Sequence, residues 1–181
     1  MTQYIQTKTL QTIDLGNPDY SEISLRTLAD ALAHVARFSG HASGYSVATH
    51  SVLVARELRD RGCTRRVQAG GLLHDLHEAV TGDVSTPMKR RMAALGFDFT
   101  RDIELPHIEA IERRFRVHTR HAAIKVVDLA MCNTEADQLL GGRVGPDWPD
   151  AEPLPFAIPT WGHARALSEF MDWADRLGVP S

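Results

Sequence analysis

The feature that most constrains this chain is the stretch 71–83, which reads GLLHDLHEAVTGD. It contains an adjacent pair, His74 and Asp75, and a carboxylate, Glu78, one helical turn later. In a helix, residues three and four positions apart lie on one side, so these side chains are predicted to project together. The small and apolar residues before them predict a buried helix, where adjacent ionisable groups are costly unless something neutralises them. A divalent metal ion is the simplest such partner, because aspartate and histidine are both common ligands.

Two other residues bear on this hypothesis, because a His-Asp pair alone is equally consistent with an exposed polar turn. Asp128 interrupts the apolar run 126–131 of a predicted helix, so its carboxylate faces the core and needs a partner, either a metal or an arginine. His50 lies in the first turns of a helix predicted over 47–61. A histidine there is usually structural, and it becomes a ligand only if the fold brings it to the His-Asp pair.

Composition predicts one domain spanning 1–181, with enough apolar residues (43%) for a core. The net charge of −3, with both signs mixed, gives no indication of a stable nucleic-acid partner. Cys63 and Cys132 have no metal-ligand spacing and are predicted to be reduced thiols. No stretch resembles a secretory signal or a membrane span, so we expect a cytoplasmic protein without a membrane partner.

The periodicity of apolar residues predicts an all-α bundle with a short N-terminal β-hairpin within 1–18. Capping residues and glycines place the boundaries of the helices. Segment 141–160 is rich in Gly and Pro and long for a compact domain, so it is either a functional flap or a covering segment. The predicted helices cover 23–38, 47–61, 65–80, 87–96, 102–118, 119–140 and 161–177.

The order and spacing of His50, His74-Asp75 and Asp128 resemble those of the HD-domain metal phosphohydrolases. The stretch 74–89 is similar to the corresponding stretch of the YfbR-like 5′-deoxynucleotidases. Residues 4–7 and the loop Arg37-Phe38-Ser39-Gly40-His41 look more like a related group of bacterial and phage enzymes, which includes phage dATP triphosphohydrolases. One departure is Thr49, where relatives often have Glu, but this neighbour is not a ligand.

The resemblance implies an all-α HD domain that holds one divalent metal ion through His50, His74, Asp75 and Asp128. The expected ions are Co²⁺, Zn²⁺ or Mn²⁺, with Mg²⁺ and Ni²⁺ as further candidates. The resemblance also gives Glu78 the role of general acid/base, and the spacing of Glu78 from the ligands permits this role. Asp83 would orient the attacking water or the Glu78 carboxyl; the alternative is a turn residue.

The candidates for substrate binding are basic and aromatic. Arg37 is the first choice as a phosphate clamp because a guanidinium binds phosphate through two hydrogen bonds. Lys89 is the second choice and Lys125 the third; for each of the three the alternative is a surface salt bridge. Core packing is the alternative for the candidates that would contact a base or sugar, which are Phe38, His41, Tyr45 and Trp161.

The leading hypothesis is a metal-dependent hydrolase of deoxynucleotide phosphate esters. Two reactions fit the same ligands: a 5′-nucleotidase acting on a monophosphate, and a triphosphohydrolase releasing the nucleoside from a triphosphate, dATP among them. More basic residues at the pocket would favour the longer phosphate chain. The alternatives are a non-catalytic nucleotide-binding sensor and a helical interaction module. Because relatives form dimers or larger rings, we also expect a homo-oligomer, in the host cytoplasm if the gene is carried by a phage.

Overall fold

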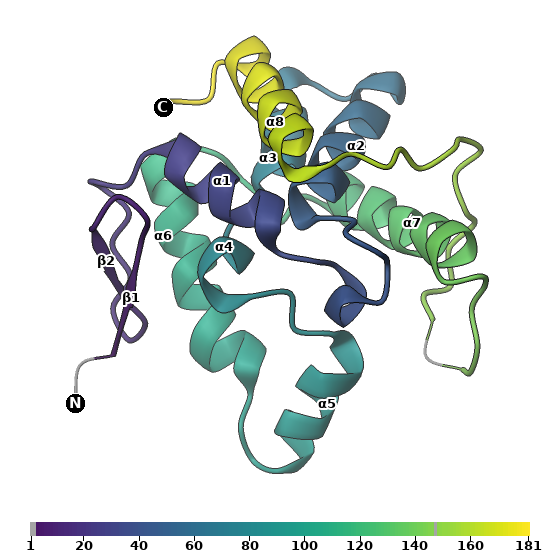
Figure 1. The fold of residues 1–181 in the computed structure, drawn as a ribbon, viewed down its shortest axis with the longest axis horizontal. Helices are drawn as coiled ribbons and strands as arrows, with labels where there is room; N and C mark the ends of the chain where they lie inside the picture. Colours follow the sequence, from purple (N-terminus) through teal and green to yellow (C-terminus); the bar gives the residue numbers. More distant parts are fainter. Residues whose placement is uncertain (1–2, 147) are drawn as a thin grey trace.

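The computed structural model describes residues 3–146 and 148–181 (Figure 1). It confirms a mostly helical chain that begins with a short antiparallel hairpin. Strand β1 (Tyr4–Gln6) pairs with β2 (Thr12–Asp14), with Ile5 opposite Ile13. Residues 1–2 of the predicted hairpin segment and residue 147 of the predicted connection lie outside the described residues.

Helix α2 (Val47–Asp60) is the centre of the bundle, and every residue from Val47 to Ala55 is buried. It begins where predicted, because the Ser46 hydroxyl accepts a hydrogen bond from the backbone N–H of Thr49. Helices α1 (Leu25–His34), α3 (Arg65–Leu73) and α8 (His163–Leu177) pack with it around one hydrophobic core. Their apolar faces, not their polar faces, therefore fix the positions of the site residues.

The remaining helices are α4 (Glu78–Thr81), α5 (Thr86–Ala94), α6 (Leu105–Phe115) and α7 (Ala122–Leu139). A short π-helix, Thr100–Glu104, runs directly into α6. Figure 1 shows α5 at the end of the molecule, connected to the bundle through the start of α6. Helix α7 packs against α2 in a second apolar cluster with Leu53, Val54 and Leu58.

Two of the predicted helices were too long. The helix predicted over 23–38 ends at His34, because the chain then becomes extended and Ala36 forms a β-bridge with Ser46. A 3₁₀ turn, η1 (Phe38–Gly40), follows. The helix predicted over 65–80 is two helices, since α3 ends at Leu73 and α4 begins at Glu78. The helix predicted over 161–177 begins two residues later, at His163, with Gly162 as its N-cap.

The connection 141–160 contains no helix or strand among its described residues, and it lies along α7 as a covering segment. Polar side chains of α7 bind its backbone directly. The Asn133 amide donates to the carbonyl oxygens of Pro149 and Ala151, and the Leu154 N–H donates to the Thr134 hydroxyl. These bonds satisfy backbone groups that would otherwise be buried without partners.

No helix in the described part of the chain is both long and apolar enough to cross a lipid bilayer.

Candidate metal centre

Two helices and one turn bring the four predicted ligands together. His50 extends from the first turn of α2 and is fully buried. His74 and Asp75 occupy the turn immediately after α3, and Asp128 comes from α7. Both α3 and α7 pack on α2. Helices α3 and α7, which both pack on α2, thus help to place side chains from distant parts of the chain at a single point.

Three of the five measured separations between ligand atoms are those expected around one ion, and two are slightly wider. The two Nε2 atoms of His50 and His74 are 3.3 Å apart. Asp128 Oδ1 lies 3.3 Å from the His50 nitrogen and 3.8 Å from the His74 nitrogen. Asp75 Oδ2 lies 3.1 Å from His74 Nε2 and 3.6 Å from His50 Nε2. Ligands bound at about 2.1 Å in tetrahedral or octahedral geometry are separated by about 3.0–3.5 Å.

The hydrogen bonds of the two Nδ1 atoms indicate which nitrogen of each histidine is free to bind a metal ion. His74 Nδ1 lies 2.7 Å from the carbonyl oxygen of Gly71, which can only accept a hydrogen bond. His50 Nδ1 lies 2.6 Å from a carboxylate oxygen of Glu135. In each neutral ring the proton is therefore on Nδ1, and the Nε2 lone pairs face each other and two carboxylates. Four acceptors that converge in this way repel one another, and a divalent cation fits the set.

The same contacts predict the state of the metal-free protein. Burial acts to lower the pKa of His74, but Asp75 and Asp128 outweigh burial and hold that pKa well above its usual value. Burial likewise opposes ionisation of Asp128, whereas hydrogen bonds from His50 and His74 lower its pKa well below the usual range. Both shifts favour a proton held between these histidines and carboxylates when no cation is bound, and a metal ion would compete with that proton.

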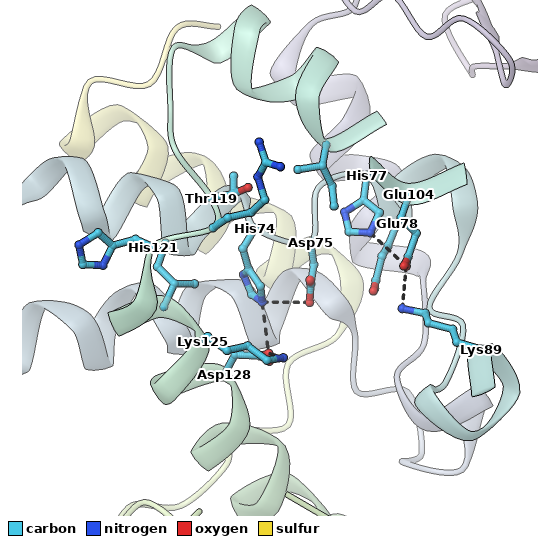
Figure 2. Close-up of a pocket in the computed structure, with 13 residues that line it drawn as sticks. His74, Asp75, His77, Glu78, Lys89, Glu104, Thr119, His121, Lys125 and Asp128 are labelled. Carbon is cyan, nitrogen blue, oxygen red and sulfur yellow. Dashed lines mark hydrogen bonds and ion pairs between the residues drawn. The ribbon is translucent and has the colours of Figure 1, made fainter. Parts of the chain in front are cut away.

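The centre forms one wall of a cavity of about 370 Å³ (Figure 2). His74, Asp75 and Asp128 lie on this wall, and Glu78 and Lys89 lie farther along it. The chain between α6 and α7 and the start of α7 form another part of the lining. The volume lies within the usual range for a small-molecule site. The lining residues from this segment are Thr119, Arg120, His121, Ile124 and Lys125.

Glu78, the predicted acid/base, is buried at the start of α4. Burial raises the pKa of its carboxyl well above the usual value, and the charges of Asp75 and Asp83 raise it further. Its Oε2 atom has no hydrogen-bond partner among the described residues. Burial and the two neighbouring carboxylates therefore favour the protonated form of Glu78, which lines the cavity.

Glu78 also belongs to a second group of ligand-type side chains, with His77 and Glu104. This group already contains a cation, because Lys89 Nζ lies 2.6 Å from Glu104 Oε1. The Thr100 hydroxyl donates to the other oxygen of Glu104 at 2.7 Å. The ammonium group supplies the charge that a metal would supply, so we assign the metal to the first group alone.

The other predicted residues are distributed around the site. Asp83 accepts a hydrogen bond from the backbone N–H of Phe38 at 3.2 Å, which joins the chain after α4 to the turn η1. Arg37 is buried, and its Nε donates to Glu135 at 2.9 Å, while its NH1 lies 3.7 Å from Asp75. Whether Arg37 and Asp83 contact a substrate remains a prediction.

Of the residues predicted to bind substrate, Lys89 and Lys125 line the cavity. Lys125 is mostly exposed and lies 3.0 Å from Asp128 Oδ2. Trp161 is buried in the core beside α8 and stacks with Arg165, which is consistent with the packing alternative. Tyr45 is buried and donates to Glu135 at 2.7 Å. His41 is exposed in the turn that precedes Tyr45.

Two carboxylates at the site, Glu135 and Glu104, were not predicted from the sequence. Glu135 follows Asp128 by seven residues, so it lies on the same face of α7 two turns later. The criterion that singled out Asp128, a carboxylate on an apolar helix face, applies equally to Glu135. Glu104 had no comparable signal, because the π-helix that positions it has no recognisable sequence pattern.

Known proteins resemble this chain over most of its length, although no protein-family profile matches it. It is 36% identical over 140 residues to the uncharacterized protein RCAP_rcc00048 of Rhodobacter capsulatus, and the match covers 71% of this chain and 69% of that protein. It is 30% identical over 156 residues to the uncharacterized protein YfdR of Escherichia coli, covering 83% of this chain and 82% of YfdR. The chain belongs to the family of YfdR and RCAP_rcc00048.

Proposed function

We propose that the chain is a metal-dependent phosphohydrolase of the HD type that acts on deoxynucleotides. The observation that carries the proposal is the convergence of four acceptor side chains beside a cavity that the buried carboxyl of Glu78 also lines. The ligands are His50, His74, Asp75 and Asp128. A divalent ion held there supplies neutralisation of a phosphoryl oxygen and a lower pKa for water.

Glu78 is the proposed general acid/base. As water attacks phosphorus, the bond between phosphorus and the nucleoside oxygen breaks, and this oxygen takes the proton of Glu78. The attacking water loses its proton in turn, which restores the acid form of Glu78. Its raised pKa suits this role, because the group must hold a proton at working pH and release it in the transition state. Asp83 is the proposed orienting residue for the Glu78 carboxyl.

The basic residues of the cavity support a substrate with more than one phosphate. Lys89 and Lys125 line it, and so does Arg120, which is half-exposed and paired with Glu112. A monophosphate bound at the metal needs few further cations, whereas a triphosphate carries additional charge to neutralise. We therefore propose a deoxynucleoside triphosphate as the preferred substrate and a deoxynucleoside monophosphate as the second.

Analysis of products tests the proposal. The purified protein is incubated with Co²⁺, Mn²⁺ or Zn²⁺ and a panel of dNTPs and dNMPs, beside an Asp75→Ala variant. We expect nucleoside and inorganic triphosphate from at least one dNTP, and no turnover by Asp75→Ala. Nucleoside and orthophosphate from a dNMP alone would retain the phosphohydrolase and overturn the substrate preference. Tight nucleotide binding without turnover under any metal would overturn the enzyme and favour the sensor.

A further inference from the structure

A carboxylate behind the metal centre has no role in the proposed chemistry. Glu135 is completely buried on α7, and all of its described hydrogen bonds come from side chains around the site. Oε1 lies 2.6 Å from His50 Nδ1 and accepts from the Tyr45 hydroxyl at 2.7 Å. Oε2 accepts from Arg37 Nε at 2.9 Å. A completely buried carboxylate is costly, so these three partners must offset its desolvation.

We infer that Glu135 is a positioning residue that sets the metal affinity of the centre through His50. Its carboxylate orients the imidazole ring and keeps the proton on Nδ1, which leaves the Nε2 lone pair directed at Asp128 and His74. A hydrogen-bonded carboxylate also makes the ring a stronger donor to a metal. This inference rests on the proposed function, since it concerns the same metal.

Arg37 and Tyr45 complete the arrangement by holding Glu135. The guanidinium neutralises Glu135, and its NH1 is 3.7 Å from Asp75 Oδ2, the ligand that follows α3. Glu135 and Arg37 thus connect a ligand on α2 to a ligand in the turn after α3. Arg37, the first choice as a phosphate clamp, is on this account primarily a support for the centre.

A purely structural ion pair inside the core is the competing explanation. It predicts that loss of the carboxylate lowers stability but leaves the affinity of the folded protein for metal unchanged. The positioning role predicts a loss of affinity that persists in folded protein. Removing Glu135 would also leave the charge of Arg37 uncompensated beside the centre, which opposes a divalent cation.

The experiment is a Co²⁺ titration of the full chain, followed by the visible absorption bands of bound Co²⁺. Glu135→Gln keeps the size of the side chain and removes its charge, and we expect the Kd to rise by roughly 10–100-fold with altered bands. Tyr45→Phe removes one bond to Glu135 and should give a smaller rise. The matched control is Asp137→Asn, also on α7, whose carboxylate pairs with Arg143 outside the centre.

Each outcome bears on one claim. Wild-type affinity and bands in folded Glu135→Gln would overturn the positioning role and leave the metal centre intact. If circular dichroism shows that Glu135→Gln does not fold, Tyr45→Phe decides by the same criterion. No saturable binding by the wild type, or equal binding by Asp128→Ala, would instead overturn the metal centre and with it the proposed function.

Discussion

At the scale of single residues, the proposed chemistry depends on the carboxyl of Glu78, whose pKa is raised well above its usual value. Its carboxyl is buried beside Asp75 and Asp83, and all three features oppose ionisation. The metal ligands are ionised or neutral acceptors, so Glu78 is the one described acid in the cavity placed to donate a proton. Its proposed contribution to catalysis should therefore be separable from metal binding.

Glu78→Gln is expected to lower kcat/KM by about 10²–10⁴-fold, because an amide cannot donate and recover the proton. Co²⁺ affinity should change little, since Glu78 is not a ligand. Steady-state kinetics and a Co²⁺ titration of the same preparation separate the two effects. Glu109→Gln, on the exposed face of α6, is the control and should retain activity. Loss of metal binding in Glu78→Gln would show that Glu78 acts as a ligand instead.

His107, away from the centre, makes stability depend on pH. It is completely buried on α6, with Nδ1 2.6 Å from the Tyr20 hydroxyl. Burial, together with the nearby His77, lowers its pKa to about 4 from an ordinary value of 6.5. Between these values the unfolded chain binds a proton that the folded chain does not, so the free energy of unfolding falls as pH falls.

Urea unfolding at pH 7 and pH 5 measures this effect. We expect His107 to remove about 2 kcal/mol of stability between the two pH values, from the shift of its pKa. His107→Gln, although less stable at pH 7, should therefore lose about 2 kcal/mol less than the wild type over the same interval. An equal loss in both proteins would show that His107 is not the responsible group.

The residues that sequence could identify are those whose type conflicts with their surroundings. Asp128 stood out because it interrupts an apolar run, and the structure gives it two histidines and a lysine as neighbours. His50 had no such conflict, and only the resemblance pointed to it. Glu135 was missed although it lies on the same face of α7 and meets the same criterion; its partners, like those of Asp128, come from distant parts of the chain.

At the scale of elements, the break between α3 and α4 positions two of the four candidate ligands, His74 and Asp75. The continuous helix predicted over 65–80 would have pointed the adjacent side chains of His74 and Asp75 about 100° apart. Instead the turn between the helices directs both toward one cation site, and the Leu76 N–H bonds to the Leu73 carbonyl across it. Sequence rules do not predict this turn, because residues 74–77 contain no glycine or proline that would mark an interruption of the helix.

The position of this turn depends on how closely α3 packs. A Cβ atom on Gly70 would lie 2.2 Å from the backbone oxygen of His118, and one on Gly71 would lie 2.3 Å from Leu58 Cδ1. The first neighbour is backbone and cannot move without shifting the chain between α6 and α7. The second is the end of a flexible side chain. The two glycines therefore differ in what a methyl group would displace.

Gly70→Ala is expected to lower the free energy of unfolding by about 1–3 kcal/mol, because overpacking outweighs the gain in helix propensity of about 1 kcal/mol. Gly71→Ala should have the smaller effect, since Leu58 can change rotamer. Urea denaturation of both variants measures the difference. A Gly70→Ala protein as stable as the wild type would show that α3 and the 116–121 segment are not in close contact.

At the scale of the whole molecule, the metal should act as a stabiliser of the fold. Its ligands come from α2, α7 and the turn after α3, which are separate in the unfolded chain. An ion that binds only the folded state adds about 2.7 kcal/mol at a hundred times its Kd. The overall helical class was predictable because amphipathic periodicity is local, whereas this three-way junction depends on tertiary packing.

Thermal unfolding should therefore shift upward by about 5–10 °C with Co²⁺ at a hundred times its Kd, and EDTA should reverse the shift. Asp128→Ala should show no shift, because one of the four ligands is gone. A metal-induced shift of the same size in Asp128→Ala would place the stabilising ion elsewhere on the molecule.

The central claim is that His50, His74, Asp75 and Asp128 hold one divalent ion. The most direct test is anomalous X-ray diffraction from crystals of the Co²⁺-loaded protein, recorded at the cobalt edge. The account predicts one strong anomalous peak between the two Nε2 atoms, about 2.0–2.2 Å from each ligand atom. A peak at His77, Glu78 and Glu104 instead, or none within reach of His50, would contradict it.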